Sequence, residues 1–247
     1  MLLGLIGSGN MAGALARGWG EPVLATDSGS GRAAALVAEL GGESLGTDVA
    51  TLGSRADTVL LAHKPYQLAS VAEQLSGFSG LVVSVLGGVT LDALRTAYPQ
   101  ASVAAVMPNT AVEVRRGVSL VAEGSDEPER VNQLFGRVGS VMTLPETALG
   151  AGTGISGVGP AYVALFAEAW IDAGVRAGLK PEQASALVLD TVNGAAELIR
   201  AHGGDTLAVR RSVTSPGGTT ARGLRALTDA GLPAALHAAM DATRRTA

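Results

Sequence analysis

Short, continuously apolar runs recur through the first part of the chain, and stretches with helical spacing of apolar residues separate them. The runs lie at residues 2–7, 23–27, 58–62, 81–85, 104–107 and 119–122. A strand that is apolar at every position is typical of a parallel sheet with helices on both faces. We therefore predict an α/β fold with a mostly parallel sheet for this part of the chain.

The strand pattern stops after about Leu144. A glycine-rich segment, GAGTGISGVGP, leads into predicted helices at residues 160–177, 181–201 and 205–211, and two more follow the segment TSPGGTT. Pro160 and Pro181 fit the first turn of a helix, where the missing N–H costs nothing. The sequence thus predicts two domains, an α/β domain over residues 1–148 and an all-helical domain over residues 149–247.

Composition excludes several classes of protein. The 247 residues carry a net charge of −4 and include no cysteine. The acidic balance argues against a nucleic-acid partner, and the lack of cysteine removes disulfides and thiolate chemistry. Three dispersed histidines predict no metal site. No apolar run reaches membrane-spanning length and the N-terminus has no basic region, so we expect a cytoplasmic protein without a membrane partner.

A glycine fingerprint follows the first predicted strand and opens a helix. Its residues are Gly7, Ser8, Gly9, Asn10, Met11 and Ala12, in the pattern G-x-G-x-x-A. The first glycine permits the tight turn, the second lets the backbone approach a pyrophosphate, and the small sixth residue allows close packing of helix on strand. The context favours a Rossmann-type dinucleotide-binding domain over a glycine-rich turn without a ligand.

The end of the second predicted strand leaves the choice of cofactor open. Asp27 is placed to bind ribose hydroxyls and to repel a 2′-phosphate, which favours NADH. Ser28 and Arg32 follow at once in the segment SGSGR, and their hydroxyl and guanidinium groups suit the phosphate of NADPH. Arg32 is equally well explained as a solvated residue in the first turn of a helix.

The segment TSPGGTT at residues 214–220 leads directly into a helical pattern. A helix start leaves backbone N–H groups unpaired, and the helix dipole adds partial positive charge, so a carboxylate can bind there without a basic side chain. The alternative is that Ser215, Thr219 or Thr220 merely caps the helix.

Six segments together resemble the pyrroline-5-carboxylate reductase family. They are IGSGNMAGAL, VLLAHKP, VVSVLGGV, VMPNT, SGVGPAY and SVTSPGGTTARGLRAL. The combination of MPN, SG-x-GPAY and TSPGGTT is far more specific than the glycine fingerprint. The chain departs from the family pattern at His63, Ala105, Val112 and Val158, where valine, arginine, proline and serine are common.

The resemblance implies hydride transfer from NADPH or NADH to the C=N carbon of 1-pyrroline-5-carboxylate, giving L-proline as the last step of proline biosynthesis. An iminium carbon is already electrophilic, so positioning can supply much of the rate. The resemblance also implies a homo-oligomer whose helical domain binds substrate and forms a dimer. The resemblance places Glu168 and Trp170 on a helix that packs against the partner subunit, but we interpret Trp170 as an ordinary core residue.

Carried over residue by residue, the resemblance places the substrate carboxylate at Ser215, Gly217, Gly218, Thr219 and Thr220. Thr220 and Ser215 are the candidate catalytic residues, with the Thr220 hydroxyl at the ring nitrogen. The segment Ala62, His63, Lys64 and Pro65 is implied to lie along the cofactor, with His63 as a backbone contact. Asn109 either caps the turn that follows it or binds the nicotinamide side.

Three alternative functions make different demands on these residues. A non-catalytic NAD(P)-sensing protein on the same fold would have no need of the TSPGGTT loop. A reductase of a related cyclic imine would keep all of these residues. A β-hydroxyacid-type dehydrogenase would need a lysine on the long helix, and residues 151–177 contain none.

Overall fold

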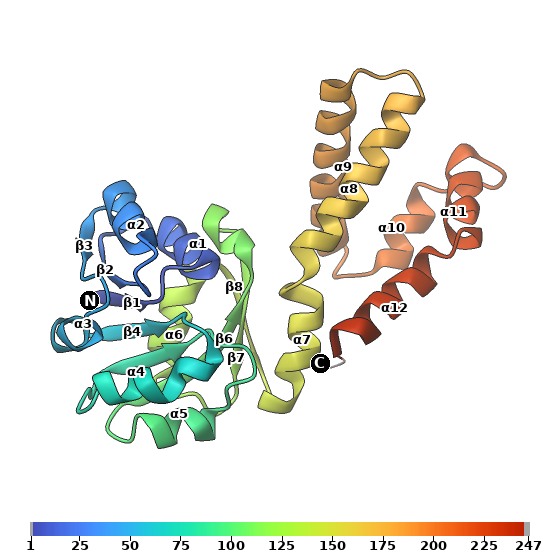
Figure 1. The fold of residues 1–247 in the computed structure, drawn as a ribbon. Helices are drawn as coiled ribbons and strands as arrows, with labels where there is room; N and C mark the ends of the chain where they lie inside the picture. The colour runs from blue at the N-terminus through green and yellow to red at the C-terminus, as the bar shows by residue number, and fades with distance from the viewer. Residues whose placement is uncertain (1, 245–247) are drawn as a thin grey trace. The chain divides into compact units, whose positions relative to one another are not determined.

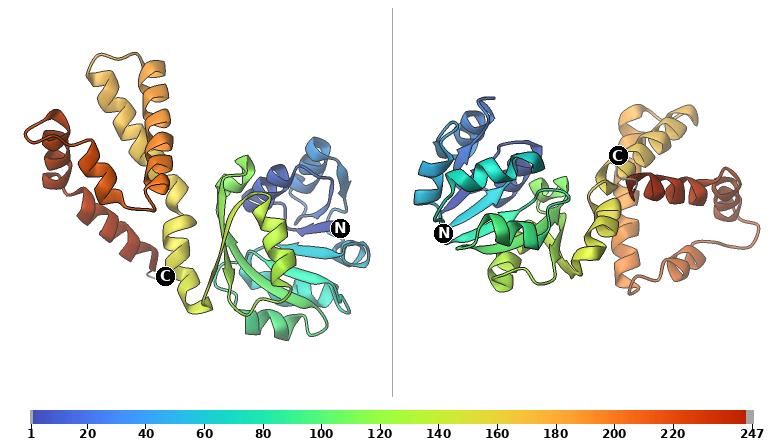
Figure 2. Two further views of the ribbon diagram at one scale, coloured as in Figure 1. Left: turned by 180° about the vertical axis from the view of Figure 1, so that it is seen from behind. Right: turned by 60° about the horizontal axis from the view of Figure 1, so that its bottom comes forward.

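A computed structural model describes residues 2–244 of the chain. The chain divides into two compact units, Met1–Pro160 and Ala161–Ala247. The sequence predicts the domain boundary earlier, at residue 148, and that boundary stays a prediction. The first unit runs from blue to yellow-green and the second from yellow to red in Figures 1 and 2.

The first unit contains an eight-stranded sheet in the order β3-β2-β1-β4-β5-β6-β7-β8. All neighbouring strands pair in parallel except β6 and β7, which are antiparallel. The fold class predicted from the sequence is therefore confirmed. The strands are β1 (Leu3–Ile6), β2 (Val23–Thr26), β3 (Gly42–Ser44), β4 (Thr58–Leu61), β5 (Leu81–Ser84), β6 (Ser102–Pro108), β7 (Gly117–Ala122) and β8 (Gly139–Leu144).

Helices cover both faces of this sheet, and each face has its own apolar core (Figure 1). One core is packed by α1 (Asn10–Trp19), α2 (Arg32–Leu40) and α6 (Pro128–Gly136). The other is packed by α3 (Val49–Arg55), α4 (Leu68–Gln74) and α5 (Leu91–Ala97), with Leu149 of α7 (Leu149–Ser156). Short 3-10 turns lie at η1 (Pro65–Gln67), η2 (Thr110–Val114) and η3 (Glu146–Ala148).

Five elements of the first unit escape the sequence prediction. The edge strands β3 and β8 leave about half of their residues or more exposed, so they lack the continuous apolar pattern of the central strands. The sequence analysis predicts no helix at α3 or α6. The glycine-rich segment is itself the helix α7 rather than a turn, and α8 starts at Gly159 as the SGVGP turn suggests.

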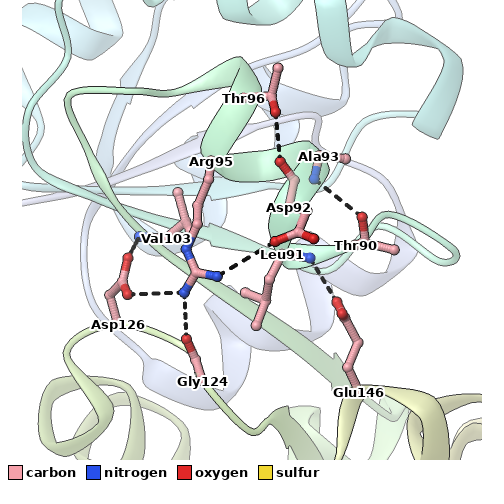
Figure 3. Close-up of polar contacts among 10 residues, drawn as sticks. All are labelled: Thr90, Leu91, Asp92, Ala93, Arg95, Thr96, Val103, Gly124, Asp126 and Glu146. Atoms are coloured by element: carbon pink, nitrogen blue, oxygen red, sulfur yellow. Dashed lines mark hydrogen bonds and ion pairs between the residues drawn. The ribbon is translucent and has the colours of Figure 1, made fainter.

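The connector between β8 and α7 is anchored at the start of α5 (Figure 3). Glu146 accepts a hydrogen bond from the backbone N–H of Leu91, the first residue of α5, and the Thr90 hydroxyl accepts one from the N–H of Ala93. Arg95 of the same helix donates to the carbonyl of Gly124 at 2.6 Å and to the carboxylate of Asp126 at 3.3 Å. These contacts join α5 to the loop after β7 and to the connector.

The second unit is entirely helical. Its helices are α8 (Gly159–Arg176), α9 (Pro181–Ala201), α10 (Thr206–Ser212), α11 (Thr219–Asp229) and α12 (Leu232–Arg244). Among the described residues of this unit only Ala167, Ala184 and Val188 are buried apolar residues. Trp170 is 42% exposed and lies against the Phe166 ring, so its interpretation as a core residue is wrong.

The stretch Glu146–Arg176 is long and apolar enough, by length and composition, to cross a membrane. This differs from the sequence prediction that no apolar run reaches that length. The prediction counted continuous apolar runs, whereas this stretch mixes glycine and alanine with larger apolar residues.

Candidate active site

The glycine loop lies between β1 and α1, where the backbone geometry requires glycine. Gly7 has a φ of +96°, and a Cβ built on it would lie 2.7 Å from the backbone of Ala62 and His63. An alanine would therefore be strained and would collide with the end of β4. Ser8 is buried and donates from its hydroxyl to the carbonyl of Thr26 at 3.0 Å, which ties the loop to β2.

The start of α1 is open toward solvent. Gly9 is the N-cap residue, and no side chain caps this helix. A Cβ built on Gly9 would meet nothing within 4 Å, so the space beside the helix start is free. The unpaired N–H groups and the helix dipole face that space and suit the phosphates of a dinucleotide.

A cleft of about 570 Å³ runs past this helix start. It is lined by every residue predicted to bind cofactor except Pro65 and Asn109. The residues that line it are Gly7, Ser8, Gly9, Asn10, Met11, Asp27, Ser28, Arg32, Ala62, His63 and Lys64. Ser30 of the SGSGR segment also lines the cleft, as do Thr47 and Gln67, which nothing in the sequence spacing marks.

The carboxylate of Asp27 is occupied by its own loop. It accepts backbone hydrogen bonds from Gly29 at 2.7 Å, Ser30 at 3.0 Å and Ala33 at 2.8 Å, and the Ser30 hydroxyl adds a fourth at 3.1 Å. Partial burial acts to raise the pKa of Asp27, but these hydrogen bonds together lower it below the usual value. The Asp27 carboxylate is therefore not the free acceptor for ribose hydroxyls that the sequence predicts. Asp27 instead holds the loop against the start of α2.

His63 follows β4 and is partly buried at the edge of the cleft. Its Nδ1 lies 2.8 Å from the carbonyl oxygen of Lys64. Because a carbonyl can only accept, Nδ1 carries the proton. Burial lowers the pKa of His63 and outweighs the opposite effect of this hydrogen bond, which favours the neutral ring.

Asn109 does not cap the turn that follows it. Its Oδ1 accepts from the N–H of Val118 at 3.1 Å, and its Nδ2 donates to the carbonyl of Ser156 at 3.0 Å. The side chain is buried and joins β7 to the end of α7. Both ends of its amide are engaged within the protein, so contact with the nicotinamide stays a prediction without structural support.

In the helical unit, the TSPGGTT segment forms a tight turn at the start of α11. Gly217 has a φ of +68°, and the N–H of Gly218 donates to the carbonyl of Ser215 at 3.0 Å. Gly218 is the N-cap residue, and no side chain of the described residues caps α11. The alternative that Ser215, Thr219 or Thr220 is merely a helix cap therefore does not hold. Because the Gly218 N–H closes the turn and the first helical bond runs from the N–H of Arg222 to the carbonyl of Gly218, the N–H groups of Thr219, Thr220 and Ala221 are available to an anion.

Two separate segments of the chain each match a known protein family. Residues 2–88 match the family described as NADP oxidoreductase coenzyme F420-dependent. Residues 146–247 match the family described as pyrroline-5-carboxylate reductase dimerisation, which identifies the chain as a homo-oligomer. The parallel sheet, the open helix start beside Gly9 and these matches define an NAD(P)H-dependent oxidoreductase.

Curated relatives and solved structures narrow this class. The chain is 39% identical over 195 residues to a pyrroline-5-carboxylate reductase of Synechocystis, covering 76% of this chain and 73% of the relative. It is 34% identical over 260 residues to that of Methanosarcina acetivorans, covering 99% and 96%. The Plasmodium falciparum pyrroline carboxylate reductase with NADP bound superposes with a TM-score of 0.85 at 28% identity, covering 99% and 95%. The chain belongs to the pyrroline-5-carboxylate reductase family.

Proposed function

We propose that the chain transfers hydride from NAD(P)H to the C=N carbon of 1-pyrroline-5-carboxylate and so forms L-proline, the last step of proline biosynthesis. Family membership supports the reaction. The observation that carries the assignment within this chain is the uncapped start of α11 in TSPGGTT, a site for a carboxylate beside the hydroxyl side chains of Ser215 and Thr220. The reaction needs such a site in addition to the dinucleotide cleft.

At the start of α11 we assign the substrate carboxylate to the N–H groups of Thr219 and Thr220, with the hydroxyl of Ser215. Gly217 and Gly218 shape this turn, because Gly217 takes a left-handed conformation and Gly218 packs directly against the Ser215 hydroxyl. The hydroxyl of Thr219 is partly engaged by Arg222 at 3.4 Å. Following the family resemblance, we assign the Thr220 hydroxyl to the ring nitrogen as its hydrogen-bond partner or proton donor.

The glycine loop residues and the N–H groups of α1 fit a pyrophosphate, because the space beside Gly9 is open and no side chain fills the helix start. When bound, NAD(P)H supplies the hydride. Ala62 and Lys64, which follow β4, line the same cleft. These residues orient the cofactor, and in our proposal most of the rate comes from this positioning because the iminium carbon is already electrophilic.

The loop after β2 supports NADPH over NADH. The acidic group that would repel a 2′-phosphate accepts four hydrogen bonds from its own loop and is not free to bind the ribose. Ser28 and Arg32 line the cleft beside it, and a hydroxyl and a guanidinium both suit a phosphate.

We further propose that the oligomer contains a dimer formed by the helical unit, in the cytoplasm and without membrane or nucleic-acid partners. Large apolar side chains are exposed on α8, among them Val163, Leu165, Phe166 and Trp170. A surface of this kind marks a protein interface. In this proposal the stretch Glu146–Arg176 is apolar because part of it lies in the dimer interface, and it does not cross a membrane.

The test is oxidation of NADPH and of NADH, at matched concentrations, by purified protein with 1-pyrroline-5-carboxylate. We expect oxidation that requires the imine and is faster with NADPH. The matched control is 1-pyrroline, which has the same ring without the carboxylate and should be a poor substrate. Binding of NADPH without oxidation would favour a sensing protein, and faster turnover of the six-membered homologue would favour a related cyclic imine.

A further inference from the structure

The imidazole of His63 contains one of two buried side-chain polar atoms that have no hydrogen-bond partner among the described residues, the other being the Tyr98 hydroxyl. The orphaned atom is Nε2. Because Nδ1 donates to the carbonyl of Lys64, Nε2 carries a lone pair in the neutral ring and needs a donor. A buried acceptor without a donor is unfavourable, and such an atom in a native protein calls for a missing partner.

The position of His63 identifies where that partner comes from. In the sheet, β1 lies between β2 and β4, and the glycine loop follows β1. The end of β2 with Asp27 lies on one side of this loop, and the end of β4 with His63 lies on the other. A dinucleotide on the glycine loop places its adenosine half at the end of β2. Its nicotinamide half therefore extends past β4, where His63 lines the same cleft.

We infer that Nε2 of His63 accepts a hydrogen bond from a hydroxyl of the nicotinamide ribose. This rests on the proposed function, and it goes beyond the backbone contact expected from the sequence. In the described conformation Nε2 is covered, so the ring turns toward the cleft when the cofactor binds. That movement breaks only the hydrogen bond from Nδ1 to Lys64. The neutral ring supplies the acceptor that a hydroxyl requires, which a valine at this position cannot do.

The first test measures dissociation constants for NADP⁺ and for adenosine 2′,5′-bisphosphate, which lacks the nicotinamide ribose. H63Q can place its amide oxygen where Nε2 lies, whereas H63N mimics only Nδ1 and H63V mimics neither. We expect H63N and H63V to bind NADP⁺ about fivefold more weakly, the effect of one lost hydrogen bond, and H63Q to bind nearly as wild type. All four proteins should bind the bisphosphate equally.

A second measurement reports on the atom itself. The chain has three histidines, so ¹⁵N-histidine labelling gives a simple spectrum in which H63V assigns the His63 signals. On addition of NADP⁺ the unprotonated Nε2 signal should move upfield, while His202 and His237 stay unchanged.

Four outcomes are decisive. An unmoved Nε2 signal with NADP⁺ bound overturns the His63 inference alone. Equal weakening of NADP⁺ and bisphosphate in the variants also overturns it, because the role would then be structural. If neither compound binds the wild type, the proposed function fails as well. Selective weakening for NADP⁺ together with the Nε2 shift supports the inference.

Discussion

The carboxylate of Glu146 and the backbone N–H of Leu91 form a 2.6 Å hydrogen bond across 55 positions of the chain (Figure 3). Leu91 is the first residue of α5, and Glu146 is the first residue of the η3 turn that leads into α7. A carboxylate at a helix start satisfies an unpaired N–H and interacts favourably with the helix dipole. The bond therefore stabilises the start of α5 and fixes the segment between β8 and α7 to that helix.

Removal of this contact should destabilise the first unit. We expect E146A to lower the free energy of unfolding by about 1 kcal/mol, the usual effect of losing a helix cap. Urea unfolding measures it, with E73A as the control because Glu73 is an exposed carboxylate on α4. Equal stability of the two variants would show that solvent replaces the Glu146 contact.

Asp27 provides a test that separates two roles for an acidic residue. If Asp27 holds the loop, D27A should weaken NADPH binding by about tenfold, because Ser28 and Arg32 lose their fixed positions and about 1.4 kcal/mol is lost. If it bound the ribose and repelled a 2′-phosphate, the same change would improve NADPH binding relative to NADH. Fluorescence titration with both cofactors distinguishes these results. T90A removes a cap from α5, outside the residues that line the cleft, and should leave both affinities unchanged.

The Thr220 hydroxyl should contribute to turnover and not to cofactor binding. We expect T220A to lower kcat by about a hundredfold, in the range for a lost proton donor, and to keep the dissociation constant for NADPH. The matched control is T228A, a change of the same kind near the other end of α11, where the hydroxyl donates to the carbonyl of Leu224. Full activity of T220A would remove Thr220 from the catalytic residues.

His63 should make stability depend on pH. Its pKa is lowered by burial in the folded protein, so the unfolded chain binds more protons at mildly acidic pH and stability rises with pH. The contribution is present above the ordinary histidine pKa of about 6.5 and is lost as the pH falls through the folded value. The fall in Tm between neutral and mildly acidic pH should therefore be larger in the wild type than in H63V. Parallel curves for the two proteins would count against a buried neutral ring.

Trp170 should stabilise the oligomer. Its ring is 42% exposed in the single chain and contacts Phe166, and a large aromatic residue in an interface is commonly among the strongest contributors. W170A should raise the dissociation constant of the dimer about thirtyfold or more, equivalent to about 2 kcal/mol. Sedimentation equilibrium measures this. M142A, which alters an exposed residue of β8 in the other unit, should not change it.

The central strands could be predicted from the sequence because they are buried on both faces. In β5 every residue from Leu81 to Ser84 is buried, and the first three are apolar. The edge strand β3 contains only Gly42, Glu43 and Ser44, and its pairing with β2 is set by the neighbouring strand rather than by its own composition. Such a strand has no pattern that could have been detected.

The candidate site, too, has residues whose role local sequence predicts and residues whose role depends on the folded structure. The glycine loop follows from local sequence, because Gly7 meets a requirement of the backbone itself and Gly9 leaves the helix start open. The role of Asp27 depends on how the six following residues fold back onto its carboxylate, and spacing alone does not reveal that. Trp170 was misinterpreted because apolar side chains bury themselves equally well in a core or against a second chain, and a single sequence does not separate the two.

The small internal core of the helical unit has a consequence for newly synthesised chains. Up to residue 244, where the described structure ends, only Ala167, Ala184 and Val188 are buried apolar residues, so this unit gains little from folding by itself. The sheet unit is made first and contains both apolar cores of its own. If the helical unit forms the dimer as we propose, its completion waits for a second chain and depends on how much protein is present. The cell would then obtain active enzyme only above a threshold rate of synthesis.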